Sequence, residues 1–68
     1  MSNHRLIASG INGTTQIFLD RWDYETYIVS VHKAGEKTTH EYFDTMTSAC
    51  YRFFKVCSEN GIQPKKES

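Results

Sequence analysis

The chain has no surplus charge of either sign and no long apolar run. Eight basic residues balance eight acidic ones among 68 residues, so the net charge at pH 7 is zero. Nucleic-acid affinity rests on neutralising phosphates, which needs a positive surplus that this chain lacks. No apolar stretch approaches the roughly 20 residues that a membrane-spanning helix requires. We therefore expect no membrane partner and regard nucleic acid as a disfavoured one.

Cysteine is also scarce, since Cys50 and Cys57 are the only two. On a helix this spacing separates them by about 10.5 Å, beyond the roughly 7 Å between Cα atoms that a disulfide allows. They cannot bridge each other, and small apolar side chains suit a buried helix face. The first residues lead into no apolar segment of the kind that signal peptides contain, so we expect no signal peptide. These features predict a cytoplasmic protein with reduced cysteines.

Sequence patterns for catalysis, metal binding or nucleotide binding are missing as well. His32 and His40 lie on neighbouring expected strands and can share a face, but no cysteine or carboxylate cluster joins them. A structural metal site needs about four ligands with supporting partners. A chain this short also buries too little core to enclose a deep cleft. We therefore expect no catalytic residue, no metal and no cofactor, and predict that the protein is not an enzyme.

What the sequence does contain is one well-marked amphipathic helix near its end. Asp44 and Thr45 are both good N-cap residues, and Asn60-Gly61 followed by Ile62 is typical of a helix C-terminus closed by an apolar contact. These signals predict a helix at about 45–60. Apolar side chains recur at three- and four-residue spacing and define its buried face: Met46, Ala49, Cys50, Phe53, Val56 and Cys57.

The preceding residues read as strands joined by short turns. Asn12-Gly13 predicts a type I′ hairpin turn, in which both central residues have positive φ. Gly35 favours a second turn, and alternation with β-forming residues predicts strands at about 5–10, 15–22, 26–33 and 37–43. The sequence thus predicts a single α+β domain over residues 1–68. Its sheet is a four-stranded antiparallel meander, or three-stranded if residues 5–10 do not pair. One C-terminal helix packs on one face, and a polar tail frays at 63–68.

The expected core lies between the helix and one face of the sheet. Its sheet residues are predicted from their alternation to be Ile17, Leu19, Tyr27, Val29 and Val31. The register of the last hairpin stays open. A two-residue turn would place one side of the final strand inward, whereas a three-residue turn with a bulge would place the other side inward. Either Tyr42 or Phe43 is then core, and a hydrophobic staple at the helix start favours Phe43.

Several aromatic residues fall outside this core. Phe18 has the opposite parity to Ile17 and Leu19, so it faces away from the helix, and Trp22 and Ile28 are expected on the same open face. Exposed apolar patches usually mark partner surfaces, and tryptophan and tyrosine are frequent hot-spot residues. The alternatives are that these side chains pack on each other as a minor core or form a homodimer. The predicted partner-binding residues are Phe18, Trp22, Asp23, Tyr24 and Tyr51.

A nucleic-acid-binding or transcription-regulating module is a second hypothesis. In it the exposed aromatic rings would stack on bases. The phosphate contacts would be Arg21, Lys33, Arg52 and Lys55.

The segment from Tyr27-Ile28-Val29-Ser30-Val31 through Tyr42-Phe43-Asp44-Thr45 to Ala49 and Phe53 follows a hairpin–helix pattern over about half of the chain. In size, charge balance and layout the chain resembles small proteins of phages and mobile elements, such as anti-CRISPR proteins. This resemblance implies a non-enzymatic inhibitor or regulator that binds a host protein of unknown identity.

Overall fold

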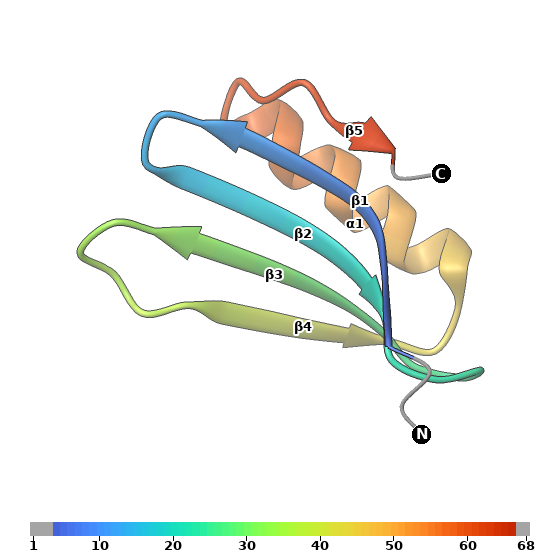
Figure 1. The fold of residues 1–68 in the computed structure, drawn as a ribbon. Coiled ribbons are helices and arrows are strands. Elements are labelled where there is room, and N and C mark those ends of the chain that lie inside the picture. Colours follow the sequence, from blue (N-terminus) through green and yellow to red (C-terminus); the bar gives the residue numbers. More distant parts are fainter. Residues whose placement is uncertain (1–3, 67–68) are drawn as a thin grey trace.

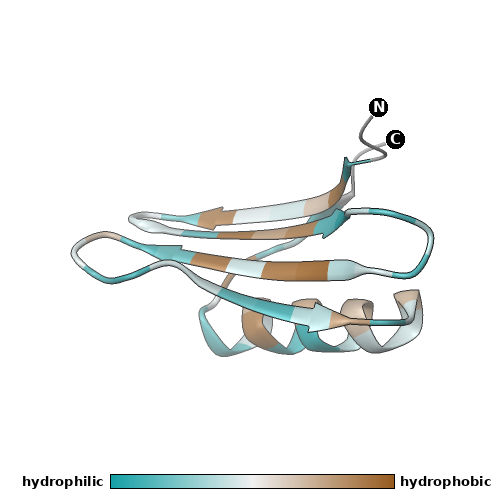
Figure 2. Cartoon of the chain, turned by 90° about the horizontal axis from the view of Figure 1, so that it is seen from below, coloured by the Kyte–Doolittle hydropathy of each residue, from teal (hydrophilic) through white to brown (hydrophobic). Residues whose placement is uncertain are grey.

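The computed structural model describes residues 4–66 and shows the α+β fold predicted from the sequence (Figure 1). In the described part of the chain, four antiparallel strands form a meander: β1 (Arg5–Asn12), β2 (Thr15–Arg21), β3 (Tyr27–Lys33) and β4 (Thr39–Phe43). The helix α1 (Met46–Glu59) follows and lies along one face of this sheet, as Figure 2 shows from below. Within residues 4–66, no element covers the other face of the sheet.

A two-residue strand, β5 (Lys65–Lys66), extends the sheet beyond β1, giving the order β4-β3-β2-β1-β5. The expected fraying of the tail at 63–68 is therefore wrong for these two residues, which pair with Ala8 and Ser9 of β1. Burial of Ile62 explains the pairing, because it holds the chain beside the unpaired edge of β1. Residues 67–68 of the predicted tail lie outside the described residues.

The first hairpin turns one residue later than the sequence indicated. Asn12 pairs with Thr15, so the loop is Gly13-Thr14, and no described residue other than glycine has positive φ. Gly13, with φ of 60°, occupies the first central position, as in a type II′ turn rather than the predicted type I′. One glycine is enough for this turn, which leaves Asn12 free to extend β1. Its side-chain Nδ2–H donates to the Asn60 carbonyl at 3.1 Å.

A bulge gives β1 its place in the core despite its few apolar residues. The register of the β1–β2 pair shifts between Leu6 and Ala8, so Ile7 is an extra residue. Both Ile7 and Ala8 pack against the core on the helix side. The strand with the weakest sequence signal is thus a full partner in the sheet.

The core lies between α1 and the sheet, as predicted. Ile17, Leu19 and Val29 are buried, and Tyr27 and Val31 pack against them at the edge. On β4 the inward residue is Phe43, while Tyr42 is 67% exposed, which decides the open question about the last hairpin. On the helix the expected face is buried except at two residues. Cys50 is half-buried, and Met46 is 41% exposed because it begins the helix beyond the main core.

Both ends of α1 are closed as their sequence signals indicated. The Thr45 side chain accepts a hydrogen bond from the Ser48 backbone N–H at 3.2 Å. At the other end Gly61 has φ of 65°, and the Ile62 and Gly61 N–H groups donate to the carbonyls of Cys57 and Ser58. These two bonds form a Schellman motif. The motif turns Ile62 back into the core.

Candidate functional site

The uncovered face of the sheet carries the side chains that alternate with the core residues. Cross-strand register places Phe18 opposite Ser30, and Ser30 opposite His40. In the next row of this face, Asp20 lies opposite Ile28, and Ile28 lies opposite Tyr42. Cross-strand neighbours on one face are in side-chain contact range. The pairing of β2, β3 and β4 therefore gathers these residues into one surface.

This surface holds a shallow depression of about 340 Å³. We call it the open-face depression, and it is lined by His4, Phe18, Asp20, Trp22, Ile28, Ser30, His32, His40 and Tyr42. Ile28 at its floor is only 6% exposed, whereas Trp22 and Tyr42 at its sides are 56% and 67% exposed. The minor-core alternative thus holds for Ile28. The two large aromatic side chains remain accessible to a partner.

All three histidines of the chain line this depression, and each is held by a neighbour. Nδ1 of His40 lies 2.9 Å from the Ser30 hydroxyl, and Nδ1 of His32 lies 2.9 Å from the Thr38 hydroxyl. The His32 ring also meets the Phe18 ring edge to face, with centroids 5.4 Å apart. These contacts order the rim of the depression. His4 lies 3.5 Å from the Asp20 carboxylate, and its ring centroid is 6.2 Å from that of Trp22.

Polar side chains and imidazole rings lie beside the apolar side chains on this surface. Within residues 4–66 no group of three or more histidine, cysteine, aspartate or glutamate side chains is placed to hold a metal ion. The Ser30–His40 contact is a hydroxyl–imidazole pair, but Ser30 is 5% exposed and lies in the interior strand β3. A buried hydroxyl needs a hydrogen-bond partner, and His40 supplies it.

The predicted partner-binding residues do not all meet. Phe18 and Trp22 line the open-face depression. Asp23 and Tyr24 lie in the β2–β3 loop, where the Asp23 carboxylate accepts from the Glu25 N–H at 2.8 Å and the Tyr24 ring stacks beneath the Arg21 guanidinium at 5.0 Å. Tyr51 is 73% exposed on α1, on the opposite side of the sheet. The predicted site is therefore split between two sides of the molecule.

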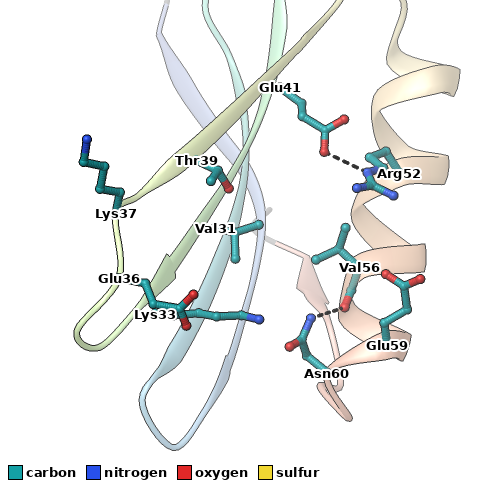
Figure 3. A pocket seen from close by; sticks show the side chains of 10 residues that line it. All are labelled: Val31, Lys33, Glu36, Lys37, Thr39, Glu41, Arg52, Val56, Glu59 and Asn60. Carbon is teal, nitrogen blue, oxygen red and sulfur yellow. Dashed lines mark hydrogen bonds and ion pairs between the residues drawn. The ribbon is translucent and has the colours of Figure 1, made fainter.

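The residues of the nucleic-acid hypothesis are dispersed as well. Arg21 and Lys33 lie at opposite ends of the β2–β3 pair. Lys33 and Arg52 line a hollow of about 250 Å³ between the β3–β4 hairpin and α1, which also contains Glu36, Glu41 and Glu59 (Figure 3). There Arg52 and Glu41 point toward one another and form an ion pair at 2.8 Å. Charges of both signs fill this hollow, so it is not a basic surface.

The sequence missed Tyr42 as a surface residue and did not join His4 to the other histidines. Tyr42 became an open-face residue only once the register of β4 was known. The sequence allowed His32 and His40 to share a face, and both do line the same depression. No sequence signal links His4 to them, because its position depends on β1 pairing with β2.

Comparison with known proteins identified no relative. No family model matches the chain, and neither the curated proteins nor the solved structures include a significant match. Among residues 4–66, α1 falls short of the length and apolarity needed to cross a bilayer.

Proposed function

We propose that this protein is a non-enzymatic binding module that holds a protein partner against the uncovered face of its sheet. One observation carries the proposal: Trp22 and Tyr42 line a depression that also contains the buried Ile28, and both stay more than half exposed. Trp and Tyr are the residues most often found at binding hot spots. The role of an inhibitor or regulator from a phage or mobile element, acting in the cytoplasm, stays a prediction. Its cytoplasmic part is supported by two cysteines that are both free.

The accessible ring of Trp22 and the ordered rim around it favour this face over the helix surface. Rims held by hydrogen bonds lose less conformational entropy on binding. Here the Thr38–His32 and Ser30–His40 contacts provide that order. Tyr51 on α1 is also exposed, yet it lines neither the open-face depression nor the hollow between the β3–β4 hairpin and α1.

The two tyrosines offer a matched test. A photo-crosslinking phenylalanine analogue replaces Tyr42 in one variant and Tyr51 in another, which are 67% and 73% exposed. In lysate of the native host, we expect the position-42 probe to give one dominant adduct with a different protein, and the position-51 probe to give none. Trp22→Ala should abolish the adduct and weaken binding of the identified partner by about 2 kcal/mol or more.

Light scattering and circular dichroism complete the test. Trp22→Ala should retain the wild-type spectrum, because more than half of this side chain is exposed. An adduct at twice the mass of the chain would replace the proposal by a homodimer through the same face. Equal adducts from positions 42 and 51, or none from either, would contradict a specific site on the open face.

A further inference from the structure

A separate hollow of about 300 Å³ lies on the helix side of the sheet. It is formed where β1 begins, β2 ends and α1 starts, which is one end of the molecule in Figure 1. Its lining is Arg5, Ile7, Arg21, Tyr27 and Met46. None of these residues lines the open-face depression, so an inference from this hollow goes beyond the proposed protein-binding function.

Two arginines stand side by side in this hollow. Arg5 of β1 is the register partner of Arg21 of β2, and both line the same concave surface. Like charges directly opposite each other on neighbouring strands destabilise a sheet. A side-chain arrangement of this kind becomes favourable when an anion lies between the two guanidinium groups.

The described residues do not supply that anion. Their ion pairs are Arg52–Glu41 and His4–Asp20, so neither Arg5 nor Arg21 has a carboxylate partner within residues 4–66. Asp44, which directly precedes the helix N-cap, pairs with neither of them in this part of the chain. No acidic residue lines the hollow.

Arg21 is nevertheless held in place. Its Nε–H donates to the Asp23 carbonyl at 3.2 Å, and its guanidinium lies 5.0 Å from the centroid of the Tyr24 ring. An arginine has five N–H donors, so this contact leaves four for a ligand. A guanidinium that is already positioned loses little entropy when it binds an oxyanion.

The start of α1 adds to the positive potential. Met46, its first residue, lines the hollow, and the first turn contains no acidic side chain. The N-terminal end of a helix favours negative charge. It reinforces the arginine pair, which carries the argument.

We propose that Arg5 and Arg21 bind a phosphate monoester that bears an apolar or aromatic group. Two planar guanidinium groups match the several acceptor oxygens of a phosphate dianion. Ile7, Tyr27 and Met46 supply the apolar part of the hollow against which the organic group packs. Phenyl phosphate is the simplest probe with both parts.

The test is a titration of the full chain with phenyl phosphate, followed by amide and methyl NMR shifts. We expect shifts centred on Ile7, Tyr27 and Met46, with weaker binding of inorganic phosphate and none of phenol. Arg5→Gln and Arg21→Gln should each lower the affinity for phenyl phosphate by at least about tenfold, because each removes a charged donor. Lys55→Gln makes the same change of charge on an exposed helix residue outside the hollow and should leave the affinity unchanged.

A second variant keeps the test decisive if an arginine variant fails to fold. Met46→Glu places a carboxylate at the first position of α1, where negative charge favours the helix. We expect this variant to fold, with an unchanged or raised Tm. Its new carboxylate should pair with the two arginines and so prevent phenyl phosphate from binding. Ser48→Glu adds the same charge to the first turn outside the lining and should bind as the wild type does.

The outcomes separate this inference from the protein-binding function. Binding of phenyl phosphate that Met46→Glu leaves intact, or shifts centred away from the hollow, would overturn the phosphate site. Trp22→Ala should not alter phenyl phosphate binding, whatever it does to a protein partner. A short phosphotyrosine peptide that binds more tightly than phenyl phosphate indicates a protein-borne phosphate, and equal affinity indicates a small-molecule monoester.

Discussion

At Gly10 the lack of a side chain lets the end of the chain reach the sheet. The residue is buried on the helix side of β1, and a Cβ added there would overlap Cγ2 of Ile62 and touch Cys57 Sγ at 3.4 Å. Its φ is not in the left-handed region, so space alone demands glycine. Gly10 and Ile62 are thus one packing unit assembled from the two ends of the chain.

Gly10→Ala should lower the free energy of unfolding by about 1–3 kcal/mol, the usual cost of overpacking. Ile62→Ala removes the obstructing atom, so the same glycine substitution should cost clearly less in that background. Urea unfolding of the two single variants and the double variant measures the coupling. Equal costs in both backgrounds would show that the two residues do not press on each other.

The two cysteines are expected to differ in reactivity. Cys57 is 1% exposed and burial raises the pKa of its thiol, whereas Cys50 is half-buried. With a thiol reagent, the Cys50→Ala variant should label only on unfolding, while Cys57→Ala should label measurably in the native state. The sequence placed both cysteines on the buried face of the helix, and the partial exposure of Cys50 revises that expectation. Rapid native labelling of Cys57 would contradict the orientation of the helix.

The same burial gives stability a pH dependence. A cysteine in the unfolded chain has a pKa of about 8.5. The folded Cys57 thiol stays protonated to higher pH, because burial raises its pKa. Between the two pKa values the folded state binds more protons than the unfolded state. The contribution of this thiol to stability is therefore complete below the unfolded pKa. It is lost as pH rises toward the folded pKa. The decline between pH 8 and 10 should be shallower in Cys57→Ala, and an unchanged slope would contradict this assignment.

At the scale of elements, the C-terminus of α1 depends on Gly61. The Schellman bonds require a left-handed residue there, and Gly61 has φ of 65°. Gly61→Ala should cost about 1 kcal/mol, because a Cβ disfavours this conformation. Gly61→Asn is the matched control and should cost less, since asparagine tolerates left-handed φ better. Thermal unfolding compares them, and equal losses would mean that φ is not the cause.

The strands show which elements local sequence patterns predict. Alternation located β2, β3 and β4, and Thr45 and Gly61 marked the ends of α1 as expected. The β1 bulge and the pairing of β5 had no local signal, because both depend on partners distant in the sequence. Local patterns report what a segment prefers, and tertiary contacts choose its neighbour.

At the scale of the whole molecule, the core is small enough that one buried side chain contributes a large share of the stability. A chain of this length has an unfolding free energy of about 3–10 kcal/mol. Phe53 is among its largest fully buried side chains. Truncating such a residue removes a substantial share of that stability.

Adjacent phenylalanines give a matched comparison. Phe53→Ala should lower the free energy of unfolding by about 3–5 kcal/mol. Phe54→Ala should lose about 1 kcal/mol, because Phe54 is 42% exposed and its ring centroid lies 5.5 Å from that of Phe53. Circular dichroism with urea measures both. Comparable losses would contradict the assigned face of the helix.

The sequence by itself determined the class of fold, the helix with its caps, the inward face of β2 and β3, and the outward parity of Phe18. These follow from periodicity and from cap chemistry, which act within a few residues. Tertiary structure decided that Phe43 rather than Tyr42 is inward, that three histidines share one depression, and that Arg5 lies beside Arg21. Each depends on strand register, and a shift by one residue moves every side chain to the other face.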